Sequence, residues 1–188
     1  MAIQGLGGLG HLAIQYARKM GFRTVAVSTG SSKKDFAFDL GATDYIDTSK
    51  ENAAEALQKM GGASMVVVTA PNAKIMGPLI NGIAPTGTLL ILARKFSCSC
   101  VHIEIMVLTD NITAVGEVPI DTVPLILKGI SVRGWPAGHA IDSEDTINFS
   151  QVQGVKCLVE RFPFNKAPEA VEAMRANKVR FRSVLVME

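Results

Sequence analysis

Short apolar runs alternate with segments of helical character along most of the chain. Continuously apolar or β-branched runs predict buried strands, and they occur at residues 1–4, 24–27, 45–47, 64–69, 88–92 and 130–133. Between them lie segments with helical spacing or helix-forming composition, at residues 11–20, 35–40, 50–60, 72–83 and 121–128. Strands joined through helices predict right-handed crossovers and a parallel sheet. The pattern therefore predicts an α/β fold.

The last part of the chain has a different order of elements. A helix is expected at residues 143–153, with Ser143 as its N-cap. A strand at residues 155–162, a helix at 166–177 and a strand at 181–187 follow it. This strand–helix–strand unit begins a second region, and we place the domain boundary between residues 154 and 155.

Composition narrows the class of protein. The 188 residues carry a net charge of +2, which gives no argument for binding nucleic acid. Hydrophobic residues make up 48%, and no apolar run reaches the length of a membrane span. The three cysteines cannot form a disulfide framework. We expect a cytoplasmic α/β domain with no membrane or nucleic-acid partner.

A glycine-rich turn follows the first strand and opens the first helix. Gly5, Gly7 and Gly10 match the G-x-G-x-x-G fingerprint of dinucleotide sites, with Gly8 and Leu9 inside the same turn. Gly5 allows the tight turn, Gly7 lets the backbone approach a diphosphate, and Gly10 lets helix and strand pack closely. The helix N-terminus then faces the anion. These residues are predicted to bind the diphosphate, against the alternative of a packing turn.

The loop after the second strand indicates which nicotinamide cofactor is preferred. NAD sites carry an acidic residue near this position, whereas this chain has Ser28, Thr29 and the lysines Lys33 and Lys34, and no carboxylate from Ser28 to Lys34. Hydroxyl and ammonium groups favour the 2′-phosphate of NADP. We expect NADP to be preferred, with NAD possible. A solvated turn with surface lysines is the alternative.

Together with several further stretches, these residues make the chain resemble the zinc-type alcohol dehydrogenases of the medium-chain dehydrogenase/reductase superfamily. The resembling stretches are residues 3–17, 40–47, 66–71, 87–93, 116–120, 130–134 and 178–187. The resemblance implies a Rossmann fold with a doubly wound, six-stranded parallel sheet at 1–154. It also implies that residues 155–188 return into a catalytic domain, most of which precedes the glycine loop in the family.

The resemblance also implies roles for single residues. Thr69 and Ala70 would end the fourth strand near the cofactor. Leu92, Ala93 and Trp135 would line the nicotinamide side, and Arg182 would reach the diphosphate; a surface arginine is the alternative. The strand at residues 130–133 would pair with its twin in a homodimer.

No catalytic residue and no metal ligand set is predicted here. In the family the zinc ligands lie upstream of the glycine loop, and a catalytic zinc needs three protein ligands. Cys157 is expected to be a buried thiol. His11 is expected to be a surface residue of the helix, with a position near the phosphate as the alternative. His139 is expected in a loop, with a role on the cofactor side as the alternative. We therefore expect the cofactor-binding part of an alcohol or aldehyde oxidoreductase, with a catalytically silent nucleotide-binding module as the alternative.

Residues 94–113 interrupt the resemblance. A metal loop with Cys98, Cys100 and His102 is one interpretation, and an inserted hairpin is another. A third is that these residues are a translated intron. The codons of Arg94 and Lys95 can contain a 5′ splice signal, and the codon of Thr113 can form part of an acceptor signal. Splicing would leave one proline codon between Ala93 and Val115. Genomic sequence beside cDNA would decide between these interpretations.

Overall fold

The computed structural model describes residues 1–70, 72–93, 118–176 and 178–187. Its main sheet has six parallel strands in the order β3-β2-β1-β4-β5-β6. The strands are β1 (Ala2–Gln4), β2 (Val25–Ser28), β3 (Asp44–Asp47), β4 (Ala63–Val68), β5 (Ile83–Ile91) and β6 (Ser131–Gly134). The chain runs outward to β3, returns to β4 beside β1, and runs outward again to β6. The predicted doubly wound Rossmann sheet is confirmed.

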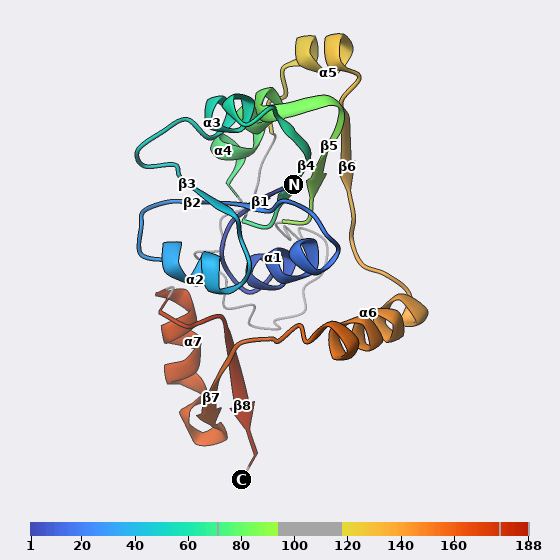
Figure 1. Ribbon diagram of the computed structural model, residues 1–188. Coiled ribbons are helices and arrows are strands. Elements are labelled where there is room, and N and C mark those ends of the chain that lie inside the picture. The colour runs from blue at the N-terminus through green and yellow to red at the C-terminus, as the bar shows by residue number, and fades with distance from the viewer. Residues whose placement is uncertain (71, 94–117, 177, 188) are drawn as a thin grey trace, which may run out of the picture.

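Helices cover both faces of this sheet (Figure 1). The helical elements associated with it are α1 (Gly10–Lys19), α2 (Lys34–Asp39), α3 (Ala53–Lys59), α4 (Ala73–Met76), the 3₁₀ helix η1 (Gly77–Gly82), α5 (Thr122–Lys128) and α6 (Ala140–Gln153). One core joins the sheet to α1 and α2 around Ile3 and Ile14, and another joins it to α3 and η1 around Val66 and Leu79. Because both faces of the sheet are covered, the inner strands carry buried apolar stretches, such as residues 25–27 of β2 and 66–68 of β4.

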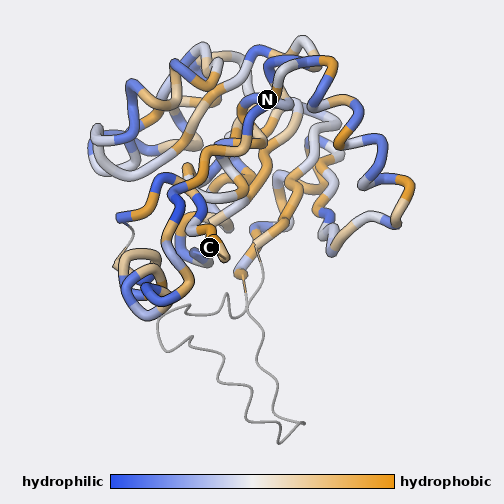
Figure 2. The backbone as a smooth tube through the Cα atoms, turned by 90° about the horizontal axis from the view of Figure 1, so that it is seen from below, coloured by the Kyte–Doolittle hydropathy of each residue, from blue (hydrophilic) through white to orange (hydrophobic). Residues whose placement is uncertain are grey.

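Apolar stretches run along the inner strands, and hydrophilic stretches lie mainly on outer turns and helices (Figure 2). Among the described residues, no helix combines the length and the apolar character that crossing a membrane requires.

Two predicted helices differ from the observed ones. The helix expected at residues 72–83 is divided into α4 and η1, where Pro78 follows Gly77. A Cβ on Gly77 would overlap the carbonyl oxygen of Pro119, so this junction is packed against the segment before α5. The later helix begins at Ala140 instead of residue 143. Its N-cap is His139, whose N–H donates to the Asp142 carboxylate at 2.6 Å, so the prediction of Ser143 as the cap is wrong.

The C-terminal unit forms a second, two-stranded sheet below α2 in Figure 1. Strand β7 (Val159–Pro163) pairs in parallel with β8 (Arg182–Val186), and the 3₁₀ helix η2 (Phe164–Lys166) and helix α7 (Ala167–Arg175) connect them. Strand β7 begins four residues later than expected, so Cys157 lies in the preceding connection. Its side chain is exposed, and the prediction of a buried thiol is wrong. The suspected insert at 94–113 lies outside the described residues.

Candidate functional site

A cavity of about 360 Å³ lies at the carboxyl ends of β1, β2 and β4. The strand order reverses at this position, and doubly wound sheets bind ligands where it does so. The cavity is lined by Gln4, Gly5, Leu6, Gly7, Val27, Ser28, Thr29, Lys33, Thr48, Ala70, Asn72 and Ile75. We call it the loop cavity. Six of the residues predicted to bind the cofactor line it, namely Gly5, Gly7, Ser28, Thr29, Lys33 and Ala70.

The glycine turn has the geometry that a diphosphate site needs. Gly5 has a φ of +94°, which side chains rarely adopt. A Cβ on Gly10 would overlap the carbonyl oxygen of Gly5, so helix α1 can start this close to β1 only with glycine there. A Cβ on Gly7 would meet no atom within 4 Å. Gly7 therefore leaves open space at the cavity wall, while Gly10 fills a packed contact.

The loop after β2 brings hydroxyl and ammonium groups to the cavity. Ser28 and Thr29 line it, and the Lys33 ammonium donates to the Leu6 carbonyl oxygen at 3.1 Å. Burial lowers the pKa of Lys33, and the nearby charge of Arg180 lowers it further. Lys34 differs from its neighbour, because its ammonium lies 6.0 Å from the centre of the Phe38 ring, outside the cavity lining. None of the lining residues is an aspartate or glutamate.

Asp47, at the end of β3, holds this loop in place. Its Oδ1 accepts hydrogen bonds from the Gly30 N–H at 2.7 Å and from the Ser49 N–H at 3.0 Å. The hydrogen bond from the Ser49 hydroxyl is the main reason that the pKa of Asp47 is lowered. The Tyr45 hydroxyl donates to the Gly30 carbonyl oxygen at 2.7 Å. Oδ1 is thus engaged by the backbone of the loop, while the buried Oδ2 lies 3.9 Å from the Lys50 ammonium. Asp47 does not line the cavity.

Thr69 and Ala70 lie beside the glycine turn, where the fourth strand ends. The Thr69 hydroxyl donates to the carbonyl oxygens of Gln4 and Gly5, at 2.9 and 3.0 Å. Ala70 lines the cavity, and its Cβ lies 2.7 Å from the position that a Cβ on Gly5 would take. Thr69 therefore supports the turn through its backbone, and Ala70 forms part of the cavity wall.

The residues predicted for the nicotinamide side lie at the same edge of the sheet but do not line the loop cavity. The Leu92 N–H donates to the Val68 carbonyl oxygen at 3.0 Å, and the Trp135 N–H donates to the Ile91 carbonyl oxygen at 3.3 Å. Trp135 is 62% exposed. Ala93 is partly buried against the core under α3. Leu9, in the glycine turn, is also outside the lining and is 47% exposed.

Arg182 comes to the glycine turn from strand β8. Its guanidinium carbon lies 3.2 Å from the position that a Cβ on Gly8 would occupy. A cation is thereby held beside the turn that is predicted to receive a diphosphate. The C-terminal unit and the glycine turn thus meet at one place.

His11 strengthens the same contact from inside. It is fully buried, so the prediction of a surface histidine is wrong. Its Nδ1 lies 3.1 Å from the Gly7 carbonyl oxygen, and its Nε2 accepts from the Leu158 N–H at 3.1 Å. Its ring stacks on Phe181 at 4.7 Å. Burial lowers the pKa of His11, and the charge of Arg182 acts in the same direction.

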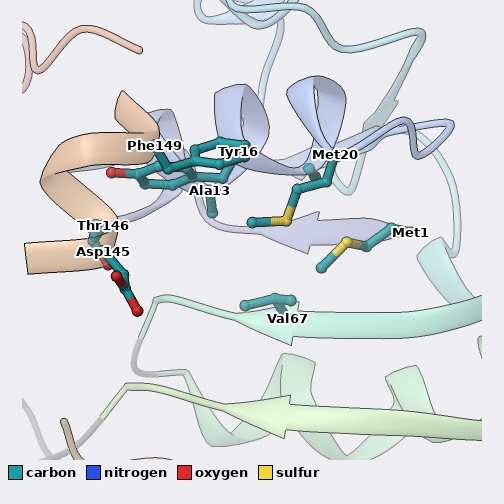
Figure 3. A pocket seen from close by; sticks show the side chains of 9 residues that line it. Met1, Ala13, Tyr16, Met20, Val67, Asp145, Thr146 and Phe149 are labelled. Atoms are coloured by element: carbon teal, nitrogen blue, oxygen red, sulfur yellow. The ribbon is translucent and has the colours of Figure 1, made fainter. Parts of the chain in front are cut away.

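A larger cavity, of about 470 Å³, lies between α1, α6 and the sheet (Figure 3). Met1, Met20, Val67 and Phe149 give it mainly apolar walls, and Asp145 is its one carboxylate. It lacks the glycine turn, and it offers no set of donors for an anion. The loop cavity is therefore the candidate cofactor site.

Sequence reasoning missed half of the cavity lining: Gln4, Leu6, Val27, Thr48, Asn72 and Ile75. Thr48 lies opposite Thr29, and their hydroxyl oxygens are 2.8 Å apart. The parallel topology could have identified them, because the carboxyl ends of all six strands lie at this edge of the sheet. The polar residues that follow the strand ends within a few positions, Thr48 and Asn72 among them, could have been included on that ground.

The described residues contain no group of three histidine, cysteine, aspartate or glutamate side chains that could hold a metal ion. Cys157 is exposed, and His139 caps α6. Cys98, Cys100 and His102 lie outside the described residues. The described part of the chain does not fit a zinc site.

The parallel sheet, with a glycine turn at its switch point, defines a nucleotide-binding domain of the Rossmann class. Comparison with known proteins gives the family. The model of the zinc-binding dehydrogenase family matches residues 8–151, and the chain belongs to that family. Over 187 residues it is 49% identical to alcohol dehydrogenase patD of Penicillium expansum, covering 100% of this chain and 49% of that protein. The chain therefore spans about half the length of this curated relative.

Solved structures share the fold at low sequence identity. Acetophenone reductase from Geotrichum candidum, solved with NAD, is 18% identical with a TM-score of 0.73, over 98% of this chain and 47% of that one. Crotonyl-CoA carboxylase/reductase AntE V350A, solved with NADP, is 17% identical with a TM-score of 0.75, over 94% and 46%. At this level of identity the two structures support the fold alone.

Proposed function

We propose that the chain is the cofactor-binding part of a zinc-type alcohol dehydrogenase and that it prefers NADP(H) to NAD(H). The observation that carries the proposal is the wall of the loop cavity, where Gly7 leaves open space beside Ser28, Thr29 and Lys33. An anionic diphosphate suits the backbone N–H groups at the start of α1. Arg182 adds a cation beside the same turn.

The preference for NADP(H) follows from the charge of the cavity wall. A 2′-phosphate needs donors and positive charge, which the Ser28 and Thr29 hydroxyls and the Lys33 ammonium supply. A ribose 2′-hydroxyl would instead favour a carboxylate. The lining contains none, and Asp47 is engaged by Gly30 and Ser49.

The reaction that we propose for the whole enzyme is hydride transfer between the nicotinamide and an alcohol or aldehyde. The cofactor supplies the hydride chemistry, and the protein supplies binding and orientation. Leu92, Ala93 and Trp135 lie at the sheet edge where the nicotinamide half would extend from the loop cavity. No step of this proposal is assigned to zinc, since the described residues do not fit a zinc site.

A catalytically silent nucleotide-binding module is the second candidate. The lack of a metal ligand set among the described residues favours it. Both candidates predict binding of NADPH. They differ in turnover, because only a complete enzyme would oxidise a panel of short-chain alcohols when zinc is present.

We also propose a homodimer formed through β6. This strand is at the edge of the six-stranded sheet, and its backbone groups on that side have no neighbouring strand among the described residues. Val132 on it is 36% exposed. Pairing with a second β6 would extend the sheet. Light scattering at two protein concentrations tests this, since a monomer at all concentrations would contradict it.

The cofactor preference is tested by the dissociation constants of NADPH and NADH for the purified chain. Tighter binding of NADPH is expected. Tighter binding of NADH would contradict the preference, and turnover of alcohols with zinc would contradict the silent module.

A further inference from the structure

Arg180 lies on the C-terminal unit and packs against α2, the helix that begins directly after Lys33 of the loop cavity. The proposed function assigns it no role. Its guanidinium carbon is 5.5 Å from the centre of the Phe36 ring, in the first turn of α2. The Phe36 ring in turn meets Phe181 edge to face, at 5.8 Å between ring centres. Arg180 is therefore held over the start of α2 by packing on an aromatic face.

Lys33 is the N-cap residue of α2, three residues before Phe36, so both residues lie at the start of this helix. The Lys33 ammonium is fixed at the cavity wall by the Leu6 carbonyl oxygen, at 3.1 Å. The charge of Arg180 lowers the pKa of Lys33, which agrees with two cations lying near each other.

Two neighbouring cations repel each other unless an anion lies between them. Within the described part of the chain, neither Lys33 nor Arg180 forms an ion pair. The Glu160 carboxylate accepts a hydrogen bond from the backbone N–H of Arg180 at 2.6 Å. That carboxylate is engaged by the backbone and makes no ion pair with the guanidinium.

We propose that Arg180 is a specificity-determining residue that binds the ribose 2′-phosphate of NADP(H) together with Lys33. This inference rests on the proposed function and adds a residue from the C-terminal unit to the site. Arg182, two residues further on, lies beside Gly8 at the diphosphate end. Arg182 would contact the diphosphate that both cofactors share, and Arg180 would contact the 2′-phosphate that only NADP(H) carries.

The test measures the dissociation constants of NADPH and NADH for the full chain and for three variants. Arg180→Gln is expected to weaken NADPH binding about 10-fold and to change NADH binding less than about 2-fold, because one charge-assisted contact is lost. Arg180→Lys keeps the charge and should recover part of the loss. Arg182→Gln is the matched control and should weaken both cofactors alike.

The outcomes separate this inference from the proposed function. If the unsubstituted chain prefers NADPH and Arg180→Gln keeps the same ratio of constants, the role of Arg180 is wrong and the proposed function stands. If the unsubstituted chain prefers NADH, both are wrong. A structural role in packing on Phe36 would change both constants together.

A second readout needs no substitution, so it serves even where Arg180→Gln does not fold. Phenylglyoxal modifies accessible arginines, and peptide mapping identifies them. Adenosine 2′,5′-bisphosphate should protect Arg180 at least about 5-fold more than ADP does, because ADP lacks the 2′-phosphate. Equal protection by the two nucleotides would overturn the inference.

Discussion

The Nε2 atom of His11 accepts a hydrogen bond from the backbone N–H of Leu158, 147 residues further along the chain, at 3.1 Å. Since Nε2 is the acceptor, the neutral ring carries its proton on Nδ1, which then donates to the Gly7 carbonyl oxygen. One buried side chain therefore connects the glycine turn with the C-terminal unit. Folding of the glycine turn and docking of the segment before β7 are therefore coupled through His11.

This arrangement makes stability depend on pH. Burial lowers the folded-state pKa of His11 below its ordinary value of 6.5. A group whose pKa is lowered on folding contributes its stability above the unfolded pKa and loses it as the pH falls toward the folded pKa. We expect the free energy of unfolding to fall as the pH drops below about 6.5. Urea titrations at several pH values measure this.

The control for the pH dependence is His11→Ala. It removes both hydrogen bonds and the ring that stacks on Phe181, which should cost about 2–3 kcal/mol at pH 8. It should also flatten the profile between pH 5 and 7, roughly the range in which histidine titrates. An unchanged profile would assign the pH dependence to other groups.

Two glycines of the same turn give opposite predictions. Gly10→Ala should destabilise the fold by about 2 kcal/mol or more, because its Cβ would overlap the Gly5 carbonyl oxygen. Gly7→Ala should leave stability within about 0.5 kcal/mol, because its Cβ would meet no atom within 4 Å. Its Cβ would instead occupy the space expected for the diphosphate, and the dissociation constant of NADPH should rise at least about 10-fold. Thermal unfolding and NADPH titration of both variants measure the two effects. Loss of stability in Gly7→Ala would contradict the assignment of that space to a ligand.

The Ser28 position should control the choice of cofactor. Ser28→Asp places a carboxylate at the cavity wall, where it would repel a 2′-phosphate and accept from a ribose hydroxyl. The ratio of NADPH to NADH dissociation constants should rise at least about 10-fold. Ser28→Asn is the uncharged control and should change the ratio less. Equal ratios in the two variants would show that charge at this position does not discriminate.

The Lys33 ammonium should act on the same phosphate. Lys33→Gln should weaken NADPH binding about 10-fold, with little change for NADH. Lys34→Gln is the matched control, because Lys34 lies over the Phe38 ring outside the cavity lining. Isothermal titration of both variants with both cofactors decides this. A larger loss in Lys34→Gln would place the phosphate elsewhere on the loop.

The sheet and its glycine turn could be predicted from the sequence because they depend on local rules. The second half of β4, residues 66–68, is apolar and buried, and the turn needs glycine at Gly5 and Gly10. The roles of His11 and Cys157 could not be predicted in the same way. The burial of His11 depends on Leu158 and Phe181, and the exposure of Cys157 depends on where β7 begins.

In the candidate site, too, some residues could be identified from the local sequence, whereas others depend on contacts between distant parts of the chain. Ser28 and Lys33 could be identified because they follow the second strand at a short distance. Arg180 could not, since it reaches α2 only through the parallel pairing of β7 with β8 and the packing of Phe181 on Phe36. Thr69 was identified by the family resemblance, and the contacts of its hydroxyl with Gln4 and Gly5 became visible only in the structure.

Direct titration of the purified chain with NADPH tests the central claim, that the glycine turn and the loop cavity bind a nicotinamide dinucleotide. We predict saturable binding with one site per chain, with adenosine 2′,5′-bisphosphate competing for it. A chain that is folded by circular dichroism but binds neither NADPH nor NADH would contradict the claim.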